Sequence, residues 1–534
     1  MIKKEVIKNV KSISFFLPPI LISIFPILSF YTSNISELSL QFLEKPLIYS
    51  VTMAIILTLL IYLLTKNKNK SAIITSLAIF IFYTYGHVSK FLDDYLFIQL
   101  PNGNVIGPDK IMLPLIFILF IFLVIKVIRS SRRYNQLIKF INISLIILIT
   151  YYGIVIVNNE YRKRNIKSTP TPQAQNTLTT NENTPDIYHI VLDGYARQDI
   201  LDEIYDYDND YFISSLKDMG FYVADKARSN YVHTYLSLPS SLYMDYLDFL
   251  PEQHGKKPIG QNAAVNLMFD NLVSRKLKDH GYTTINFVSD WSGTNENYVA
   301  DINYTYDKYF KFSGVSLVTS ETNMVFLQTT LLSPFIKEVW RDALRGKILT
   351  AFEKLPDIPY QSGKKYTLAH ILAPHPPYVF NADGSAVEGA ELETADEGIE
   401  RRGKYLSQVT YISNQTLPVL QQLIDNSENV PIIILQSDHG PASILGRRED
   451  WKDNYGQEGV KERSSILYAI YFPDQDYEEL YPTITPINTY RILFNKYFDE
   501  NLELLPDKTY FTFYEAAYDY IDVTNEIIKD KDPD

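Results

Sequence analysis

Residues 187–194 read IYHIVLDG, and residues 431–440 read PIIILQSDHG. Each stretch is a run of apolar, mostly β-branched residues that stops at acidic or imidazole side chains, as buried parallel strands do. In an open α/β sheet, ligands bind in the crevice at the carboxyl ends of the strands. We therefore expect Asp193, Asp438 and His439 to meet there, where two carboxylates and an imidazole suit Zn²⁺ or Mn²⁺. The pattern indicates a metal-dependent hydrolase or transferase.

Composition narrows the classes of protein that fit this chain. It has 534 residues, more than one compact domain usually holds, with a net charge of −12 and no cysteine. An acidic chain without basic patches argues against a nucleic-acid partner. Because cysteine is absent, disulfides, thiolate metal sites and a cysteine nucleophile are excluded.

Long apolar stretches are confined to the first 160 residues. A helix that crosses a bilayer needs about 20 mostly apolar residues, so four or five of these stretches are predicted to span a membrane. The first has no small-residue cleavage site, which favours a retained anchor over a removed signal. The stretches are Ile13–Phe30, Leu47–Leu64, Ala72–Tyr85, Met112–Ile128 and Ile141–Val157.

Basic residues predict the orientation of these stretches in the cell (inner or plasma) membrane. Lysine and arginine are concentrated before the first stretch, between the second and third, and between the fourth and fifth. Under the positive-inside rule these loops are cytoplasmic. The N-terminus is then cytoplasmic, and everything after Val157 is extracytoplasmic. The basic segment Tyr161–Arg164 conflicts with this orientation, but the three earlier loops agree with one another.

The remaining chain predicts a tether and a second domain. Residues 168–185 read STPTPQAQNTLTTNENTP, a polar sequence without a helical stripe. The predicted organisation is a transmembrane helical domain over 1–160, a flexible tether over 161–185, and an extracytoplasmic catalytic domain over 186–534.

Strand-like and helix-like segments alternate within the last of these domains. Such alternation predicts an α/β fold with a mostly parallel central sheet flanked by helices. The predicted strands are 187–192, 283–288, 366–372, 431–436 and 466–472. The predicted helices are 198–218, 263–279, 320–345 and 403–424.

A hydroxyl-rich stretch, residues 228–242, reads RSNYVHTYLSLPSSL. It leads into a predicted helix, Ser240–Phe249. A hydroxyl near the N-terminus of a helix can attack an anionic group that the terminal N–H donors hold. The same pattern also fits an ordinary helix capped by serine or threonine, and spacing alone does not select one hydroxyl.

These motifs occur in the order found in the alkaline phosphatase superfamily: Asp193, the hydroxyl-rich stretch, His375 in APHPPY, and the SDHG of 437–440. Within it the chain resembles the sulfatase-like membrane transferases, among them the lipoteichoic acid synthases and the lipid A phosphoethanolamine transferases. The resemblance implies about five N-terminal spans, a tether and an external sulfatase-like domain. Residues 234–239 (TYLSLP) are similar to the nucleophile segment of the phosphoethanolamine transferases, which implies that Thr234 is the nucleophile.

The chain departs from those transferases in three ways. They use glutamate where this chain has Asp193, they carry another histidine downstream, and they hold the nucleophile loop with disulfides. Here 440–534 contains no histidine, and no cysteine is present. The prediction is therefore one divalent metal, Mn²⁺ or Zn²⁺, held by Asp193, Thr234, Asp438 and His439, rather than two.

Other polar residues are weaker candidates. In the related transferases a histidine placed like His375 contacts the phosphate or the leaving group, so His375 is predicted to be catalytic. His370 is expected inside a strand and is interpreted as structural. Arg197 and Arg463 could neutralise phosphate oxygens or be ordinary surface arginines. The role of His233, beside the predicted nucleophile, is left open.

The function that this resemblance implies is transfer of a phospholipid head group, phosphoethanolamine or glycerol phosphate, to a cell-surface glycan or glycolipid through a phosphothreonine. Several membrane spans favour a lipid donor. The alternative is a membrane-anchored phosphodiesterase or sulfatase that hydrolyses phosphate or sulfate esters. Residues 237–241 resemble the sulfatase signature, but Ser241 stands where that signature has arginine. A non-catalytic assembly factor is the third class, and the competent residues at all four metal positions argue against it.

Overall fold

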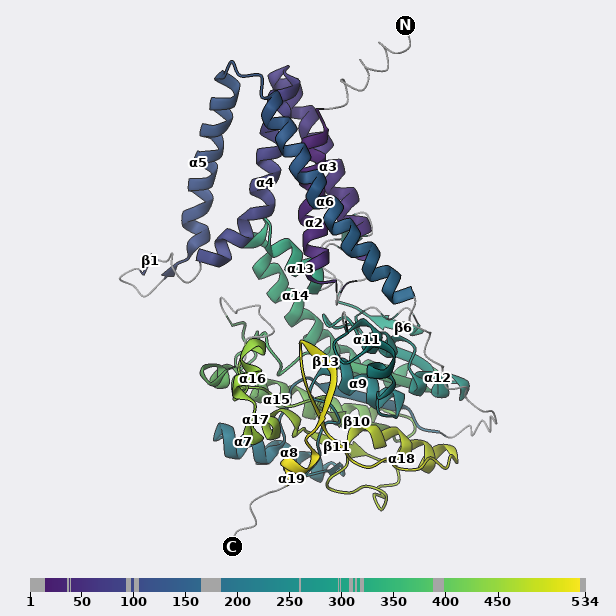
Figure 1. Cartoon of the computed structure of the whole chain (residues 1–534). Coiled ribbons are helices and arrows are strands. Elements are labelled where there is room, and N and C mark those ends of the chain that lie inside the picture. The colour runs from purple at the N-terminus through teal and green to yellow at the C-terminus, as the bar shows by residue number, and fades with distance from the viewer. Residues whose placement is uncertain are drawn as a thin grey trace. The chain divides into compact units, whose positions relative to one another are not determined.

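The computed structural model groups the chain into two compact units (Figure 1). One comprises Met1–Lys167 and Thr322–Lys337, and the other comprises Ser168–Glu321 and Glu338–Asp534. The described residues are 15–35, 38, 40–92, 98–99, 105–164, 184–258, 261–295, 297, 299–306, 311–312, 315–316, 321–387 and 398–528. Most of the predicted tether, 165–183, lies outside them, and its flexibility stays a prediction.

The first unit contains the apolar helices that the sequence predicts. They are α2 (Leu17–Ser33), α3 (Gln41–Thr65), α4 (Lys68–Leu92), α5 (Pro108–Arg129) and α6 (Asn135–Arg164). Among the described residues, four helices are long and apolar enough to cross a membrane, and α2 is shorter. The third predicted stretch, Ala72–Tyr85, is part of α4, whose 25 residues make it long enough to span. The predicted N-terminal helical bundle is confirmed.

A segment from the middle of the chain belongs to this same unit. Thr322–Lys337 covers most of α13 (Glu321–Gln328) and the start of α14 (Ser333–Lys354). The backbone N–H of Gly86 donates to the carbonyl of Thr329 at 3.1 Å, and the ring of Phe326 lies 5.1 Å from that of Phe30. A Cβ atom at Gly86 would lie 1.9 Å from a backbone oxygen of this segment, so only glycine allows the contact.

The second unit is built on a seven-stranded sheet of order β4-β11-β10-β3-β9-β5-β6. All neighbours from β10 to β6 are parallel, and β11 is antiparallel to both of its neighbours. This confirms the predicted α/β fold with a mostly parallel sheet. The strands are β3 (Ile187–Leu192), β4 (Tyr222–Val223), β5 (Thr283–Phe287), β6 (Ile302–Tyr304), β9 (Lys365–Ile371), β10 (Ile432–Gln436) and β11 (Tyr468–Tyr471).

The register of the central strands places the candidate site. Ile190 of β3 pairs with Leu435 of β10 and with Ala369 of β9. Every residue of these three strands is buried, which explains their continuous apolar sequences. Because the strands are parallel and in step, the residues that follow each one emerge at the same edge of the sheet.

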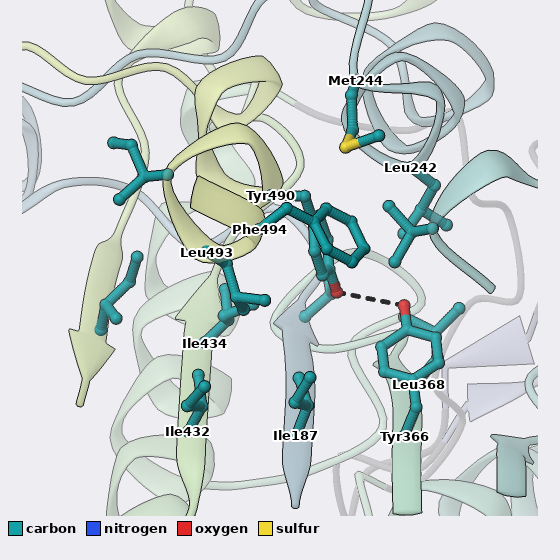
Figure 2. Close-up of a cluster of buried hydrophobic side chains, with 14 of the residues drawn as sticks. Ile187, Leu242, Met244, Tyr366, Leu368, Ile432, Ile434, Tyr490, Leu493 and Phe494 are labelled. Atoms are coloured by element: carbon teal, nitrogen blue, oxygen red, sulfur yellow. Dashed lines mark hydrogen bonds between the residues drawn. The ribbon is translucent and has the colours of Figure 1, made fainter. Parts of the chain in front are cut away.

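Helix α18 (Pro486–Phe498) covers one face of these strands. Figure 2 shows Leu493 and Phe494 of this helix above Ile187 and Ile432 of the sheet. The Tyr490 hydroxyl donates to that of Tyr366 at 3.1 Å, so the polar end of this buried ring has a partner. The start of the C-terminal region is therefore part of the main core.

The other helices of this unit connect and flank the strands (Figure 1). They are α7 (Gln198–Tyr205), α8 (Asp210–Asp218), α9 (Thr234–Tyr243), α10 (Phe249–His254), α11 (Asn262–Phe269), α12 (Leu272–Asp279), α15 (Arg402–Asn426), α16 (Trp451–Asn454), α17 (Gln457–Ser464) and α19 (Thr524–Ile528). A hairpin of β12 (Tyr510–Phe513) and β13 (Ala516–Asp522) lies between α18 and α19 in the sequence.

Four predicted helices differ from those observed. The helix predicted over 198–218 is divided into α7 and α8, and the one predicted over 320–345 is divided into α13 and α14. The predicted helix 263–279 is divided into α11 and α12, because the Asn271 side chain caps α12 by accepting from the N–H of Ser274 at 2.8 Å. The helix predicted over Ser240–Phe249 begins six residues earlier, at Thr234, and ends where Met244 adopts a left-handed conformation with φ 57°. The earlier start places Thr234 in the first turn of α9.

We expect Leu493→Ala to lower the free energy of unfolding of the second unit by about 2–5 kcal/mol, because it leaves a cavity against the sheet. Leu493 is 1% exposed, whereas Leu504, the matched control, is 39% exposed. Tryptophan fluorescence during urea unfolding reports on this unit, since it contains all three tryptophans, Trp291, Trp340 and Trp451. Equal losses in Leu493→Ala and Leu504→Ala would contradict this packing.

Candidate active site

The residues that follow β3 and β10 converge at the carboxyl edge of the sheet. His439 Nε2 lies 3.3 Å from Asp438 Oδ2 and 3.7 Å from Asp193 Oδ1. All three side chains are at most 4% exposed. The structure thus brings together the two carboxylates and the imidazole that the sequence singles out.

The hydrogen bond of His439 fixes which ring nitrogen faces the carboxylates. Nδ1 lies 3.0 Å from the carbonyl of Gly440, which can only accept, so Nδ1 carries the proton. Nε2 then carries the lone pair. Burial, followed by the positive charge of Arg463, lowers the pKa of His439 well below its ordinary value. The ring is therefore neutral, which is the form that binds metals.

Burial of the two carboxyl groups close together changes the pKa of each. Burial, and after it the negative charge of Asp193, raises the pKa of Asp438 to about 6. Burial opposes ionisation of Asp193 as well, but the surrounding imidazoles, His375 first, outweigh it and lower its pKa. Asp193 Oδ1 and Asp438 Oδ2 are buried and accept no hydrogen bond. Two unsatisfied oxygens beside a lone-pair nitrogen fit a divalent cation.

Thr234 reaches this cluster from the first turn of α9. Its Oγ1 lies 3.0 Å from His439 Nε2. The helix begins here because the carbonyl of His233 accepts from the N–H groups of Leu236 and Ser237. The Ser237 hydroxyl, by contrast, donates to the main-chain carbonyl of Asp438 at 2.6 Å. Of these two hydroxyls, that of Thr234 faces the candidate metal ligands, and that of Ser237 links the helix to the end of the strand.

His375 follows β9 and lies beside Asp193. Its backbone N–H donates to the carbonyl of Asp193 at 2.9 Å, and its Nδ1 donates to the carbonyl of Pro376 at 2.6 Å. Nε2 therefore carries the lone pair. Ligand atoms of Asp193, His375 and His439 all lie within 4.8 Å of one another. His375 can thus bind a ligand or exchange a proton at the edge of the cluster.

His370 also contacts the cluster, although the sequence suggested a structural role inside a strand. Its Nε2 lies 3.2 Å from Asp193 Oδ2, and its Nδ1 lies 2.8 Å from Thr294 Oγ1. Together with Asp193 and Asp438 it forms a second group of potential metal ligands. The only local signal in the sequence was a histidine within an apolar strand, which does not reveal its neighbours.

The two arginines that the sequence left open have different surroundings. Arg197 binds the Asp199 carboxylate through Nε and Nη2, each at 2.7 Å, and is therefore held by a local ion pair. Arg463 is 2% exposed and its Nη2 lies 3.0 Å from His439 Nε2. Arg463 belongs to the cluster and Arg197 does not.

His233 is part of an aromatic stack rather than of the cluster. Its ring is parallel to those of Tyr235 and Trp451, with both centroids 5.1 Å away. Its Nε2 donates to the carbonyl of Thr512 at 2.9 Å. The ring anchors the residue that precedes Thr234.

We expect Asp438→Asn to weaken binding of Zn²⁺ or Mn²⁺ by at least about 10-fold, the smallest loss typical even of residues that only support a metal ligand. The cause is loss of one of the two negative charges that would attract the cation. Metal affinity is measured by competition with a chelator. Asp199→Asn is the control, since Asp199 pairs with Arg197. Unchanged affinity in Asp438→Asn would contradict this ligand set.

Comparisons with known proteins identify one family and several similar solved structures. The family described as Sulfatase matches residues 171–463. No curated protein matches the sequence. Similar solved structures include the zinc complex of the C-terminal periplasmic domain of EcEptC from Escherichia coli, with 13% identity, 62% of this chain and 86% of that chain covered, and a TM-score of 0.38.

Two further solved structures are similar to this chain, and one of them is of an integral membrane protein. The integral membrane lipooligosaccharide phosphoethanolamine transferase A (EptA) from Neisseria meningitidis has 13% identity, 86% and 87% coverage and a TM-score of 0.35. The lipoteichoic acid synthase LtaP from Listeria monocytogenes has 14% identity, 63% and 76% coverage and a TM-score of 0.37. Because the family match covers more than half of its length, the protein belongs to the sulfatase family and is a sulfatase-like enzyme.

Proposed function

We propose that the protein is a metal-dependent membrane transferase. It moves a phospholipid head group, phosphoethanolamine or glycerol phosphate, to a cell-surface glycan or glycolipid through a phosphothreonine at Thr234. The observation that carries this proposal is the position of Thr234 Oγ1, 3.0 Å from the lone-pair nitrogen of His439. A hydroxyl held beside a candidate metal site, in the first turn of a helix, is placed to become a nucleophile.

One divalent metal, Mn²⁺ or Zn²⁺, would be held by Asp193, Asp438 and His439 together with Thr234. The unsatisfied carboxylate oxygens of the two aspartates support this ligand set. When bound, such a metal lowers the pKa of a coordinated hydroxyl and offsets negative charge on phosphate oxygens.

The first half of the reaction transfers the head group to the protein. Thr234 Oγ forms a bond to the phosphorus of the lipid phosphodiester, and the bond from phosphorus to the glycerol oxygen of the lipid breaks. The proton that the threonine hydroxyl loses balances the one that the departing oxygen gains. His375 would give this oxygen its proton, since its Nε2 has a lone pair with which to take up and release one.

The second half of the reaction releases the head group. A hydroxyl of the glycan or glycolipid attacks the same phosphorus, and the bond between phosphorus and Thr234 Oγ breaks. The threonine takes back a proton and the acceptor loses one. No nucleotide is required, which suits a catalytic domain on the extracytoplasmic side of the membrane.

The N-terminal helices support a lipid donor. One anchor is enough to keep a protein at a membrane, whereas the part of this chain that the structure describes has four helices long and apolar enough to cross it. The basic loops between them favour a cytoplasmic N-terminus and an extracytoplasmic catalytic domain. In this arrangement the donor is a lipid of the outer leaflet.

The sulfatase family match keeps hydrolysis as the second candidate, in which water accepts the phosphoryl or sulfuryl group of a phosphate or sulfate ester and the alcohol leaves. The geometry favours phosphate chemistry at Thr234 over sulfatase chemistry at Ser237. Ser237 donates its hydroxyl to a main-chain carbonyl, and Ser241 replaces the arginine of the sulfatase signature.

We expect wild-type protein, loaded with Zn²⁺ or Mn²⁺ and incubated with phospholipids in detergent, to gain the mass of a head-group phosphate. Thr234→Ala should gain nothing, because it lacks the attacking oxygen. Intact-mass spectrometry measures both and identifies the head group.

Two variants control this experiment. Thr234→Ser keeps a hydroxyl and should form the adduct more slowly, and Ser237→Ala should still form it. An adduct on Thr234→Ala, or loss of the adduct only in Ser237→Ala, would overturn the assignment of the nucleophile. Ester hydrolysis without an adduct on a metal-loaded protein would favour the hydrolase.

We expect His375→Gln to slow adduct formation by about 10²–10⁴-fold with a phospholipid, because the departing alkoxide loses its proton donor. A p-nitrophenyl phosphodiester should be affected much less, since its leaving group needs no proton. Rates for both donors, measured by stopped incubation and mass spectrometry, distinguish the two cases. Equal slowing with both donors would show that His375 acts otherwise than on the leaving group.

A further inference from the structure

Arg463 brings a permanent positive charge into the candidate metal site. It lies near the end of α17 and is 2% exposed. Arginine stays charged at any physiological pH, and its planar fork binds carboxylate and phosphate oxygens in fixed directions. The guanidinium therefore keeps its charge inside the site.

Two main-chain carbonyls fix the plane of this guanidinium. Nε donates to the carbonyl of Val232 at 2.8 Å, and Nη1 donates to that of Gly440 at 2.8 Å. The face of the group lies over the ring of Trp451, with Cζ 5.4 Å from its centroid. These contacts hold Nε, Nη1 and one face of the guanidinium. Its third nitrogen, Nη2, points into the cluster.

Nη2 shares its acceptor with the metal that the site would bind. It lies 3.0 Å from His439 Nε2, the nitrogen that carries the lone pair because Nδ1 donates to Gly440. One lone pair cannot both bind a cation and accept a hydrogen bond. Metal binding at His439 would therefore take this acceptor away from Arg463 Nη2.

We propose that Arg463 exchanges its acceptor when the site is loaded: Nη2 bonds to His439 Nε2 in the metal-free protein and to an oxygen of the phosphate group in the loaded protein. This inference rests on the proposed function, in that it takes phosphate as the group that the site binds. Arg463 is then a substrate-binding residue, and its guanidinium offsets the charge that the phosphate brings beside Asp193 and Asp438.

A purely positioning role for Arg463 predicts a different result. The side chain links Val232, two residues before Thr234, to Gly440, directly after His439. If this link were its only role, removing it would displace a metal ligand and weaken metal binding. Exchange of acceptors predicts the opposite, because removing Nη2 removes a competitor for the lone pair of His439.

Arg463→Met tests the proposal in the full-length protein in detergent. Methionine keeps an unbranched apolar chain against Trp451 and has no donor. We expect Zn²⁺ affinity, measured by chelator competition, to be equal to or tighter than that of wild type. We expect affinity of the Zn²⁺-loaded protein for inorganic phosphate, measured by calorimetry, to fall at least 10-fold. Arg275→Met is the control, since Arg275 pairs with Asp270 on the surface of α12, and it should change neither affinity.

Weaker Zn²⁺ binding in Arg463→Met, or unchanged phosphate binding, would overturn the proposal. Arg463→Lys keeps the test decisive if the methionine variant does not fold. Lysine keeps the charge and cannot make both carbonyl bonds and reach the site at once. We expect Zn²⁺ affinity no weaker than in wild type and a loss of phosphate affinity, and a loss of Zn²⁺ affinity instead would overturn the exchange.

These measurements are independent of group transfer. A protein that binds Zn²⁺ and phosphate as expected but forms no adduct at Thr234 would refute the proposed transferase and leave the role of Arg463 standing. A wild-type protein that binds Zn²⁺ but no phosphate would overturn the role of Arg463, whatever happens at Thr234.

Discussion

Repulsion between two buried carboxylates, Asp193 and Asp438, is the constraint on which the rest of this site depends. They lie at the ends of adjacent parallel strands, at most 4% exposed, and each keeps one oxygen without a hydrogen bond. Burial with a like charge nearby raises the pKa of Asp438 to about 6. Such a pair is costly to bury unless a cation binds between the carboxylates. The sheet register that brings them together thus carries a cost in stability that a bound cation would offset.

The surrounding backbone holds Thr234, the proposed nucleophile, and Arg463 against this pair. The N–H of Gly440 donates to the carbonyl of Arg463 at 2.7 Å, and the N–H of Ser229 donates to that of Ser464 at 2.8 Å. A Cβ atom at position 440 would lie 2.1 Å from a carbonyl oxygen of α17, so glycine is required where the strand end and this helix touch. Main-chain hydrogen bonds therefore act together with the side chains of Ser237 and Arg463 to set the distance between Thr234 and the candidate metal ligands.

The sequence predicted the strands well and the surroundings of the site poorly, for a physical reason. All five predicted strands begin and end within two residues of those observed, because strands buried on both faces have continuous apolar sequences with sharp ends. The same sharp ends identified Asp193, Asp438 and His439. The contacts of His370 and Arg463 depend instead on how distant segments fold onto one another, and no local periodicity records that. The choice of Thr234 among several hydroxyls came from family resemblance. The geometry that favours it depends on where α9 begins, and the sequence predicted this start six residues too late.

Charge balance would make an arginine useful at this site if it binds a single metal ion, as proposed. Two carboxylates and one divalent cation sum to zero, so a phosphodiester adds an uncompensated negative charge to a buried environment. A buried histidine would not supply the missing positive charge, because burial lowers the pKa of His439 well below its ordinary value and keeps its ring neutral. A guanidinium keeps its charge under the same burial. One metal with Arg463 can therefore offset the charge of the phosphate group, a task for which other sites use a second metal ion.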